Sequence, residues 1–383
     1  MKKIDIICCS TDDWDEIWRR RQHLCNGLSK KDWIGKILFV EPAFSMWSNL
    51  RRLRLNDSKN IEKIRKINDK IYVFKPIWPL PFVRFNMIRK LNFDIYLKQV
   101  KKQMRKLDLR NVITWFSHPS YESIAGKFGE KMIWYDCTDD WSKMPAITKH
   151  TARIFERQQD EIIRKANIVT VVSQDLLDKA KKINRNSYLI QNGVDFEFYS
   201  NAMNKNNSMP EDLKGVLRPI LGYVGSIWAD RLDFNLVKYI AEKKKNWSLV
   251  FIGPITVGSD LGNIRKFKNV HFLGKKSYQE LPKYMTNFDI CIIPHKKNEL
   301  TESMNPIKLY EYFAIGKPII STDIAGVRKY NDVIEIAQSY EEFVNFAENL
   351  LKNDSKDLKN KCLQYAQGNS WQRRVEERER ILK

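Results

Sequence analysis

Short apolar runs of four to six residues recur along the whole chain, and segments with helical periodicity lie between most of them. This order of elements is typical of parallel sheets whose strands are joined by crossover helices. The expected strands of the first half are Ile4–Cys9, Lys36–Glu41, Ile71–Lys75, Val112–Phe116, Lys131–Tyr135, Ile168–Val172 and Tyr188–Gln191. The sequence therefore predicts an α/β fold.

The pattern restarts after residues 200–215, a polar stretch rich in Asn that has no periodicity. The expected strands of the second half are Pro219–Val224, Ser248–Ile252, Val270–Leu273, Ile290–Ile293, Pro318–Ser321 and Val333–Ile336. The expected helices there are Phe234–Lys244, Gln279–Tyr284, Pro306–Ile315, Tyr340–Leu351 and Trp371–Leu382. Because 383 residues are many for one domain, we predict two doubly wound domains with a ligand cleft between them.

The predicted organisation is a first Rossmann-like domain at residues 1–195, a linker at 196–218, a second Rossmann-like domain at 219–366 and a C-terminal helix at 367–383. Ligands of doubly wound sheets bind beyond the carboxyl ends of the strands. Candidate functional residues are therefore those that directly follow an expected strand.

The chain carries a net charge of +21, and much of the excess lies near its start. Residues 1–110 contain 26 Lys and Arg against 12 Asp and Glu, a net charge of +14. Residues 46–66 and 75–106 carry most of it and interleave basic side chains with Trp, Phe and Leu. Such segments suit an anionic membrane surface, with a solvated basic face as a close alternative. Because no nucleic-acid-binding motif is present, we expect no nucleic-acid partner.

Six cysteines occur without a CxxC pair, and the five histidines lack metal-ligand spacing. We therefore expect free thiols and no metal site. No apolar run is long enough to span a membrane, and the start MKKIDIICCS fits a buried strand better than a secretory signal. We expect a cytoplasmic protein, peripheral on the inner face of the cell membrane.

Residues 305–320, NPIKLYEYFAIGKPII, have the features of a helix followed by a strand. Asn305 suits the N-cap and Pro306 the first helical position. The unpaired backbone N–H groups of such a helix start attract anions, and Lys308 adds a cation there. Glu311, one turn further, either accepts hydrogen bonds from ribose hydroxyls or pairs with Lys308 on a solvated face. Its place beside the apolar stripe favours the ribose role.

The loop after the expected strand Pro219–Val224 reads GSIWADR. Gly225 permits close approach of a ligand to the backbone, Ser226 offers a hydroxyl and Arg231 a cation. The glycines do not form a GxGxxG fingerprint, which weighs against a nicotinamide enzyme.

Several motifs occur together in one order and spacing: NGVD at 192–195, GYVGSI at 222–227, FIGP at 251–254, residues 271–294, residues 305–322 and SWQRR at 370–374. Over residues 191–372 the chain resembles the group 1 retaining glycosyltransferases of GT-B fold, close to bacterial teichuronic-acid and surface-polysaccharide transferases. The first half resembles them more weakly, through RRRQHL at 19–24 and WYDCTDDW at 134–141. The resemblance implies two Rossmann-like domains that face a central cleft, and a C-terminal helix that returns to the first domain.

The resemblance also implies a nucleotide-sugar donor, UDP-sugar favoured and GDP-sugar as the alternative, and no prosthetic group. Glu311 matches the family's ribose-binding residue. Ser303 stands where the family has a second glutamate, with Glu302 adjacent, and Ser226 stands where it has an arginine. The residues assigned to donor binding are Gly225, Ser226, Gly274, Lys275, Pro294, Ser303, Met304, Asn305, Pro306 and Glu311. Catalysis is assigned to His118, Arg231 and Lys308.

The first domain is expected to bind the acceptor. His118 follows a candidate strand and would contact the donor sugar or move a proton, or else fix a turn before Pro119. Asp136, Asp139 and Asp140 are more often caps or sugar-hydroxyl acceptors than metal ligands when they lie so close in sequence. Trp141 is expected to stack on a sugar or to lie in the core. Asp12 and Asp13 follow the first strand, where an acceptor would enter.

The expected function is transfer of a sugar from a nucleoside diphosphate to a lipid-linked or polysaccharide acceptor in cell-surface glycan synthesis. Two alternatives remain: a sugar-nucleotide 2-epimerase of the same fold, and a non-catalytic protein that binds nucleotide sugars.

Overall fold

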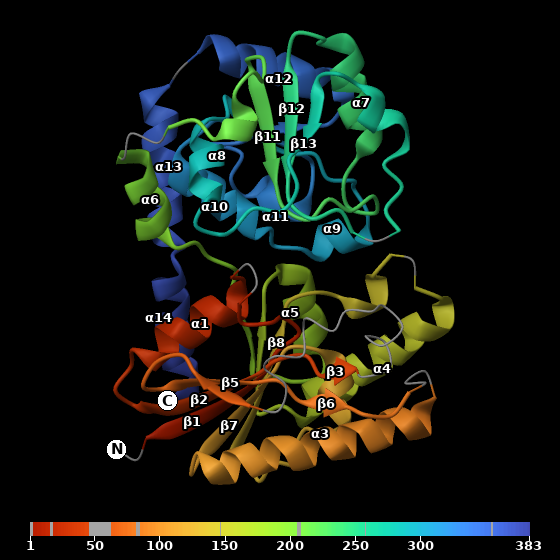
Figure 1. The fold of residues 1–383 in the computed structure, drawn as a ribbon, viewed down its shortest axis with the longest axis vertical. Coiled ribbons are helices and arrows are strands. Elements are labelled where there is room, and N and C mark those ends of the chain that lie inside the picture. The colour runs from red at the N-terminus through yellow and green to blue at the C-terminus, as the bar shows by residue number, and fades with distance from the viewer. Residues whose placement is uncertain are drawn as a thin grey trace. The chain divides into compact units, whose positions relative to one another are not determined.

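A computed structural model describes residues 3–15, 18–45, 63–81, 85–145, 147–204, 208–256, 258–353 and 355–383. Residues 46–62, most of the first basic stretch, lie outside them. The chain forms two compact units, each built around its own sheet (Figure 1). Unit 1 comprises Met1–Ile190 and Glu377–Lys383, and unit 2 comprises Gln191–Glu376. The last helix, α14 (Trp371–Leu382), begins in unit 2 and ends in unit 1.

Among the described residues, the unit 1 sheet has eight strands in the order β10-β9-β8-β7-β1-β2-β5-β4, parallel except for the β4–β5 pair. They are β1 (Ile4–Cys9), β2 (Ile34–Val40), β4 (Ile64–Lys66), β5 (Ile71–Phe74), β7 (Val112–Phe116), β8 (Met132–Cys137), β9 (Ile168–Val171) and β10 (Ser187–Leu189). A separate short pair joins β3 (Phe44–Ser45) to β6 (Ile77–Trp78). Chain order reverses between β1 and β7, so residues after these two strands meet at a switch point.

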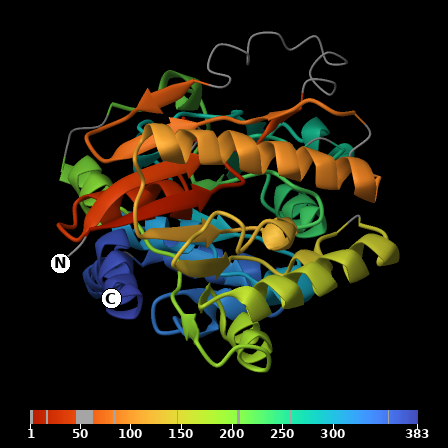
Figure 2. The ribbon, with the colours of Figure 1, turned by 90° about the horizontal axis from the view of Figure 1, so that it is seen from below.

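Helices cover both faces of the unit 1 sheet. Helix α3 (Asn86–Lys106), orange in Figure 2, packs its buried Phe93 and Tyr96 into the core that contains Cys9. On the other face Cys8 contacts Cys25 of α1 (Arg20–Ser29). Helices α4 (Lys149–Lys165) and α5 (Gln174–Lys181) complete the α3 face. The two neighbouring cysteines thus point to opposite faces because side chains alternate along a strand, and all six cysteines are buried free thiols.

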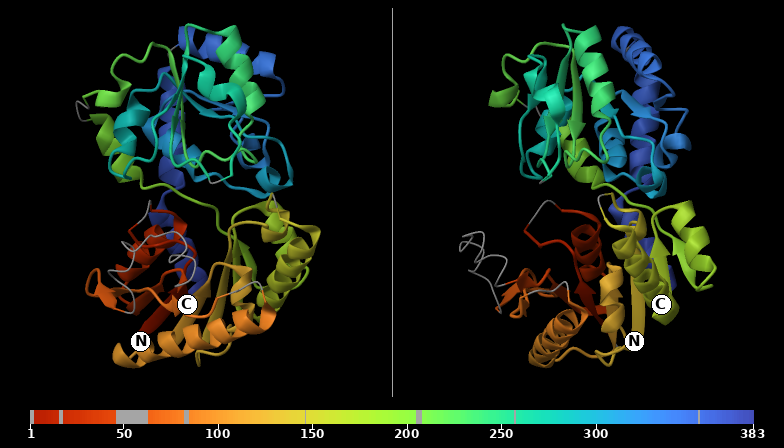
Figure 3. Two further views of the ribbon diagram at one scale, coloured as in Figure 1. Left: turned by 45° about the vertical axis from the view of Figure 1, so that its right-hand side comes forward. Right: turned by 90° about the vertical axis from the view of Figure 1, so that its right-hand side faces the viewer.

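The described part of the unit 2 sheet has six parallel strands in the order β13-β12-β11-β14-β15-β16. They are β11 (Ile220–Val224), β12 (Ser248–Ile252), β13 (Val270–Phe272), β14 (Ile290–Ile293), β15 (Ile319–Thr322) and β16 (Glu335–Ala337). Helices lie on both sides (Figures 1 and 3). One core contains residues of α7 (Phe234–Lys243) and α12 (Tyr340–Lys352). The other contains residues of α8 (Leu281–Thr286), α10 (Ile307–Ile315) and α13 (Lys356–Gly368).

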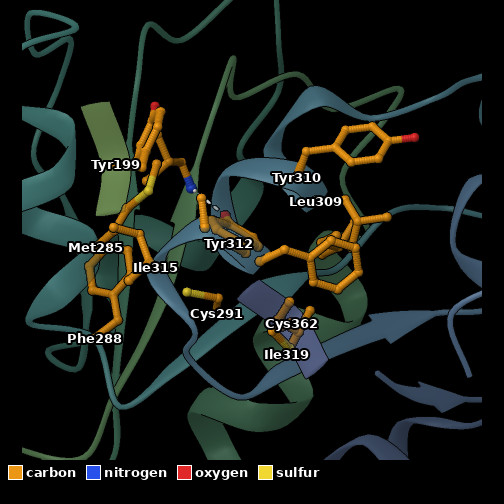
Figure 4. Packing of buried hydrophobic residues seen from close by; sticks show 14 of the residues in the cluster. Tyr199, Met285, Phe288, Cys291, Leu309, Tyr310, Tyr312, Ile315, Ile319 and Cys362 are labelled. Carbon is orange, nitrogen blue, oxygen red and sulfur yellow. Dashed lines mark hydrogen bonds between the residues drawn. The ribbon is translucent and has the colours of Figure 1, made fainter. Parts of the chain in front are cut away.

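Helix α10 is the central helix of that second core. Leu309, Tyr310, Tyr312 and Ile315 are buried within it (Figure 4). The hydroxyl of Tyr312 accepts a hydrogen bond from the backbone N–H of Val224 at 2.9 Å. The position of α10 is therefore tied directly to the end of β11.

The predicted strands and helices agree closely with the structure, and β1, β7, β12, β14 and α14 have the predicted bounds. The strands β3, β4 and β6 and the helices α9 (Glu299–Ser303), α11 (Ala325–Arg328) and α13 were not predicted. Residues 196–218, expected as a linker, contain α6 (Phe196–Asn204) and the short helix η4 (Glu211–Leu213), whose Tyr199 and Leu213 are buried in the unit 2 core. The aromatic residues of α6 provide this packing, which the Asn-rich composition concealed.

Candidate functional site

The unit 2 sheet reverses its strand order between β11 and β14. Residues 225–231 and 294–298 follow these strands and lie at the switch point, where doubly wound sheets bind ligands. The two loops are joined by an antiparallel bridge between Leu232 and His295 and by a 2.7 Å hydrogen bond from the N–H of Lys296 to the carbonyl of Arg231. Pro294, predicted at the end of this strand, is buried there.

Three glycines bring the ends of β11, β12 and β13 together. Gly225 and Gly253 have φ of +149° and +145°, and a Cβ on Gly253 would lie 2.0 Å from the carbonyl oxygen of Gly225. Gly253 in turn donates its N–H to the carbonyl of Gly274 at 2.9 Å. Gly274 and Lys275 are exposed at the end of β13. The absence of side chains at Gly225 and Gly253 thus lets these strand ends pack closely on each other and on Tyr223 and Lys308. The predicted approach of a ligand to the Gly225 backbone stays a prediction.

The start of α10 differs from the prediction. Pro306 is the N-cap, and no described side chain caps the helix, so the assignment of Asn305 as N-cap is wrong. The Asn305 side chain is buried, and its Oδ1 accepts the backbone N–H of Asn192 at 2.8 Å while its Nδ2 donates to the hydroxyl of Tyr310 at 2.9 Å. The physical reason is that a buried backbone N–H at residue 192 needs an acceptor, and Asn305 supplies it.

Lys308 lies in the first turn of α10 and is only 8% exposed. Its Nζ is 5.1 Å from the centre of the Tyr223 ring, a cation–π distance. A Cβ on Gly225 would lie 3.1 Å from its Cε, so the side chain lies beside the glycine loop. Burial and the charge of Arg231 lower the pKa of Lys308 to about 7, and Glu311 opposes them.

Glu311 is half-buried one turn further along α10. Burial raises the pKa of its carboxyl group, and the nearby hydroxyl of Tyr199 and the ammonium of Lys308 oppose the shift. Among the described residues Glu311 and Lys308 form no ion pair, and Lys308 is buried. The alternative of a solvated Glu311–Lys308 pair is therefore wrong.

Arg231 and His295 are two further residues that interact electrostatically with Lys308. The Arg231 guanidinium lies 5.3 Å from the Trp228 ring centre, and its Nε is buried without a hydrogen-bond partner in the described part of the chain. The His295 ring is 1% exposed, and neither of its nitrogens has a described partner. Burial and the charges of Lys308 and Arg231 hold the pKa of His295 well below its usual value.

His295 is a residue that sequence reasoning missed, although it stands two residues after β14 and passes the same strand-end criterion. Within the described residues, the switch point thus combines two cations that form no ion pair with a buried neutral imidazole. Burying like charges together without a paired acid is costly, and a bound anion would offset that cost.

The position of the expected second glutamate offers no carboxylate. Ser303 ends α9, and its hydroxyl donates to the carbonyl of Leu300 at 2.9 Å. Glu302 forms an ion pair with Arg328 at 2.8 Å. Met304 follows and is 8% exposed. A ligand contact at Ser303 would therefore have to come from a hydroxyl that already has a partner.

At the unit 1 switch point His118 follows β7. Its Nδ1 accepts the N–H of Ser120 at 3.1 Å and caps the short helix η2 (Pro119–Ser123), so the turn-fixing role is present. Its ring lies 4.2 Å from that of Trp141, centre to centre. Burial and the charge of Arg21 lower the pKa of His118 to about 4. With Nδ1 accepting, a neutral ring carries its proton on Nε2, so it is a hydrogen-bond donor rather than a base at neutral pH.

Trp141, which contacts His118, and Asp139 are both half-buried. The indole N–H of Trp141 is buried and has no hydrogen-bond partner among the described residues. Asp140 caps the short helix η3 (Trp141–Lys143) through the N–H of Ser142 at 3.2 Å. The prediction that residues of the acidic cluster cap helices is therefore confirmed for Asp140. The indole N–H of Trp141 is a hydrogen-bond donor without a partner among the described residues.

Asp136 is fully buried and holds together the interior of unit 1. Its two oxygens accept from Nε and Nη2 of Arg20, both at 2.9 Å, and Oδ1 also accepts from Thr170 at 2.6 Å and from Arg378 of α14 at 3.2 Å. The arginines hold the pKa of this carboxyl group below its usual value, against the effect of burial. The prediction that Asp136 contacts an acceptor is therefore corrected: its oxygens are engaged inside the fold.

Asp12 and Asp13 follow β1, as predicted. Asp12 is 6% exposed and pairs with Arg21 and, at 3.2 Å, with Arg19. Asp13 is partly exposed and pairs with Lys75 at 2.8 Å. Of the two, only Asp13 presents surface to a ligand.

Among the described residues, no group of three or more His, Cys, Asp or Glu side chains could hold a metal ion. No described helix is both long and apolar enough to cross a membrane.

Unit 2 contains a segment that is similar to a known family. Residues 218–353 match the family model described as "Glycosyl transferases group 1". The similarity to the group 1 glycosyl transferases therefore lies in unit 2. The matched segment includes Gly225, Arg231, His295 and the whole of α10, so the switch-point site lies inside it.

One curated relative of this chain is the "Putative teichuronic acid biosynthesis glycosyltransferase TuaH" of Bacillus subtilis (strain 168). It is 26% identical over 227 residues, which are 56% of this chain and 56% of the relative. The chain therefore spans about half the length of this relative. The sequence-based recognition of the family is confirmed.

Solved structures confirm the GT-B fold over the whole chain. Sucrose-phosphate synthase from Thermosynechococcus elongatus has a TM-score of 0.72 at 13% identity and covers 100% of this chain and 98% of its own. Anabaena HepE in complex with UDP and glucose has a TM-score of 0.67 at 14% identity, with 100% and 99% covered. The E. coli structure titled "Trehalose-6-phosphate from E. coli bound with UDP-2-fluoro glucose" has a TM-score of 0.68 at 11% identity, with 97% of both covered.

Proposed function

We propose that this chain is a retaining glycosyltransferase that moves a sugar from a nucleoside-diphosphate sugar to a lipid-linked or polysaccharide acceptor. The observation that carries the proposal is buried Lys308 beside Gly225, with Arg231 close enough to lower its pKa. Two cations, a bare backbone loop and an uncapped helix start suit the charge and size of a diphosphate. The name of the Bacillus subtilis relative supports a role in bacterial cell-surface glycan biosynthesis.

A UDP-sugar is the favoured donor. HepE and the E. coli structure, which share the fold, are titled as complexes with UDP or a UDP-sugar. We assign the ribose to Glu311, because its carboxylate lies one turn behind the diphosphate position and forms no ion pair among the described residues. Gly274 and Lys275 would lie beside the base. A GDP-sugar is the alternative that the experiment below tests.

In the proposed reaction the acceptor hydroxyl oxygen forms a bond to the anomeric carbon, and the bond from that carbon to the diphosphate oxygen breaks. The diphosphate leaves with the electron pair and takes the acceptor proton on the same face of the sugar. Arg231 and Lys308 neutralise the charge that develops on it. His118 would donate from Nε2 to a sugar hydroxyl, and no protein side chain is assigned as base.

We assign the acceptor to unit 1, with Asp13, Asp139 and Trp141 as the contact residues. A glycan is held by carboxylates that accept from its hydroxyls and by a flat aromatic face. Asp12 would orient the loop through its two arginines rather than touch the acceptor.

Peripheral attachment to an anionic membrane is proposed for α3. The side chains of Phe85, Met87 and Leu91 are 52%, 74% and 46% exposed. Met87 and Leu91 lie on one helix face with the exposed Lys98 and Lys102. An apolar tip beside a basic stripe suits a surface of anionic headgroups.

A donor panel tests the proposal directly. Purified full chain is incubated with UDP-, GDP- and dTDP-sugars, and the shift in melting temperature identifies the donor by mass action. Free nucleoside diphosphate is then measured with and without membrane extract as the source of acceptor, and the anomeric configuration of the product is read by NMR.

The outcomes separate the three candidate functions. Release of diphosphate that depends on extract, with retained configuration, is the expected result. An epimerase would change the sugar without any acceptor. A binding protein would give a melting shift without turnover, and no shift with any donor would refute a nucleotide-sugar site.

A further inference from the structure

The two chain segments that connect the units lie side by side inside unit 2. The first follows Ile190 and the second precedes Glu377. The N–H of Val194 donates to the carbonyl of Asn369 at 3.1 Å, and the N–H of Trp371 donates back to Val194 at 2.9 Å. A Cβ on Gly193 would lie 2.8 Å from the carbonyl oxygen of Asn369. Only glycine permits this approach, so the two segments are held as one parallel pair.

Asn192 fastens this pair to the start of α10. Its backbone N–H donates to Oδ1 of Asn305 at 2.8 Å, and its side-chain Nδ2 donates to the carbonyl of Asn305 at 2.6 Å. Asn192 and Asn305 are 7% and 5% exposed. Asn305 directly precedes Pro306, the N-cap of the helix that carries Lys308 and Glu311. Two buried hydrogen bonds therefore run from the connecting pair to the residue beside the diphosphate position.

Arg374, in the second connecting segment, also bonds Asn192. It is 6% exposed, and its Nε donates to the carbonyl of Asn192 at 3.0 Å while its guanidinium also bonds the side chain of Asn369. The main-chain N–H of Asn192 thus bonds Asn305, just before α10, and its carbonyl accepts a bond from Arg374 of α14. A shift at the start of α10 would break or strain bonds to both connecting segments.

We propose that Asn192 and Asn305 are positioning residues that couple occupancy of the diphosphate site to the order of the two connecting segments. The inference rests on the proposed function. A diphosphate bound at the helix start restricts Asn305, whose two oxygens both hold Asn192. Ordering in one part of such a buried network lowers the cost of ordering the rest.

Hydrogen exchange of the full chain with and without UDP tests the coupling. In the wild-type protein UDP should slow exchange at 225–231, at the start of α10, and in both 190–194 and 369–377. Asn192→Ala removes the Nδ2 bond to Asn305 and keeps the backbone N–H bond, so UDP should still protect the first two regions but should protect the connecting segments clearly less. Asn192→Asp keeps the side-chain shape and removes the Nδ2 donor, so it serves if the alanine variant does not fold.

Tyr310→Phe is the matched control, because it removes the other partner of the Asn305 side chain and leaves Asn192 untouched. It should retain protection of the connecting segments. Protection of those segments in both Asn192 variants at the wild-type level, or its absence in a wild-type protein that binds UDP, would overturn the inference. Failure of UDP and GDP to bind at all would instead count against the proposed function.

Steady-state kinetics give a second test, because a residue that only stabilised the fold would not change kcat selectively. Asn192→Ala should lower kcat on the order of tenfold and change the donor KM by less than about threefold. A wild-type kcat would overturn the inference. A rise in donor KM at unchanged kcat would do so too, because the residue would then serve donor binding alone.

Discussion

The ammonium nitrogen of Lys308 lies 5.1 Å from the centre of the Tyr223 ring, and the end of the same side chain lies against Gly225. This relationship joins the first turn of α10 to the loop after β11. A buried lysine near an arginine, with no acid paired to it among the described residues, is unfavourable for folding. Its presence at a switch point is therefore best explained by an anionic ligand.

The affinity for UDP should fall as the pH rises from 7 to 9. The pKa of Lys308 is about 7 in the free protein, so the ammonium that attracts the diphosphate is progressively lost in this range. Calorimetry at pH 7, 8 and 9 should give a Kd on the order of tenfold weaker at pH 9. Lys308→Met should bind more weakly at pH 7 and lose the pH dependence. A Kd of the wild-type protein that stays constant over the range would contradict the assignment.

Because Lys308 loses its destabilising charge, the free energy of unfolding of the protein should rise with pH. The pKa of Lys308 falls from 10.5 to about 7 on folding, so between these values the unfolded chain binds more protons than the folded one. The free energy of unfolding therefore rises with pH across this window. Lys308→Met should be more stable than wild type by on the order of 2 to 4 kcal/mol at pH 6, with the difference vanishing near pH 10.

Denaturant unfolding at pH 6, 8 and 10 measures this difference. Lys245→Met, at an exposed position of the same unit, is the control and should change stability little at any pH. If Lys308→Met and the wild type had the same free energy of unfolding at pH 6, the buried Lys308 ammonium would not destabilise the fold, contrary to this prediction.

Glu311→Gln should weaken UDP binding about tenfold, because the amide loses the charge that strengthens acceptance from two ribose hydroxyls. Calorimetry with UDP and with 2′-deoxy-UDP separates the ribose from the rest of the ligand. The variant should lose much less affinity for the deoxy compound, which offers only one of the two hydroxyls. Equal losses of affinity for both ligands would show that the Glu311 carboxylate does not bind the ribose hydroxyls. Glu341→Gln, at an exposed position of α12, is the control for the loss of one negative charge.

Asp136→Asn should destabilise unit 1 rather than impair acceptor binding. Removing the carboxylate leaves Arg20 and Arg378 buried without their shared anion, which costs on the order of 3 to 5 kcal/mol. Because the folded-state pKa of Asp136 lies below its usual value of 3.8, its stabilisation is present above that pH and is lost as the pH falls further. Unfolding at pH 7 and pH 3 should therefore show a large difference from wild type that shrinks in acid.

Asp178→Asn, at an exposed position of α5, is the matched control for Asp136. A variant at Asp136 with wild-type stability but a raised acceptor KM would restore the acceptor role that the structure argues against.

The apolar tip of α3 should determine binding to anionic vesicles. Replacing Met87 and Leu91 together by Asp should reduce sedimentation with vesicles that contain anionic lipid by at least about tenfold in affinity. Leu217→Asp, at a 68% exposed leucine of unit 2, should change nothing. If the α3 variant sedimented with vesicles as the wild type does, α3 would not bind the membrane, and its basic face would be a solvated surface.

The donor-site candidates came from a rule of position and from the family resemblance. Gly225 directly follows a predicted strand, and parallel strands bring such residues to one edge of the sheet, whereas Gly274 and Pro294 were assigned by their match to the family motifs. Lys308 and Glu311 were found from helix periodicity. His295 satisfied the same rule but was overlooked, since nothing in the sequence marks a histidine as buried beside two cations.

The errors concern side chains whose partners lie far along the chain. Asn305 looks like an N-cap locally, yet its acceptor is taken by Asn192, 113 residues away. Asp136 looks like a strand-end ligand, yet one of its arginines lies 242 residues away in α14. Local sequence propensity does not show whether a side-chain oxygen accepts from a nearby N–H or from a buried N–H far along the chain.

The order of apolar and polar residues by itself determined two parallel α/β sheets, most strand bounds and the edge of the sheet where ligands bind. It did so because strand and helix periodicities and short loops act locally. Only the tertiary structure decided which polar side chains are engaged inside the fold and which are left for a ligand. The physical reason is that a buried polar group bonds whatever partner the packed fold brings within reach, as the pairs Asn192–Asn305 and Asp136–Arg378 show.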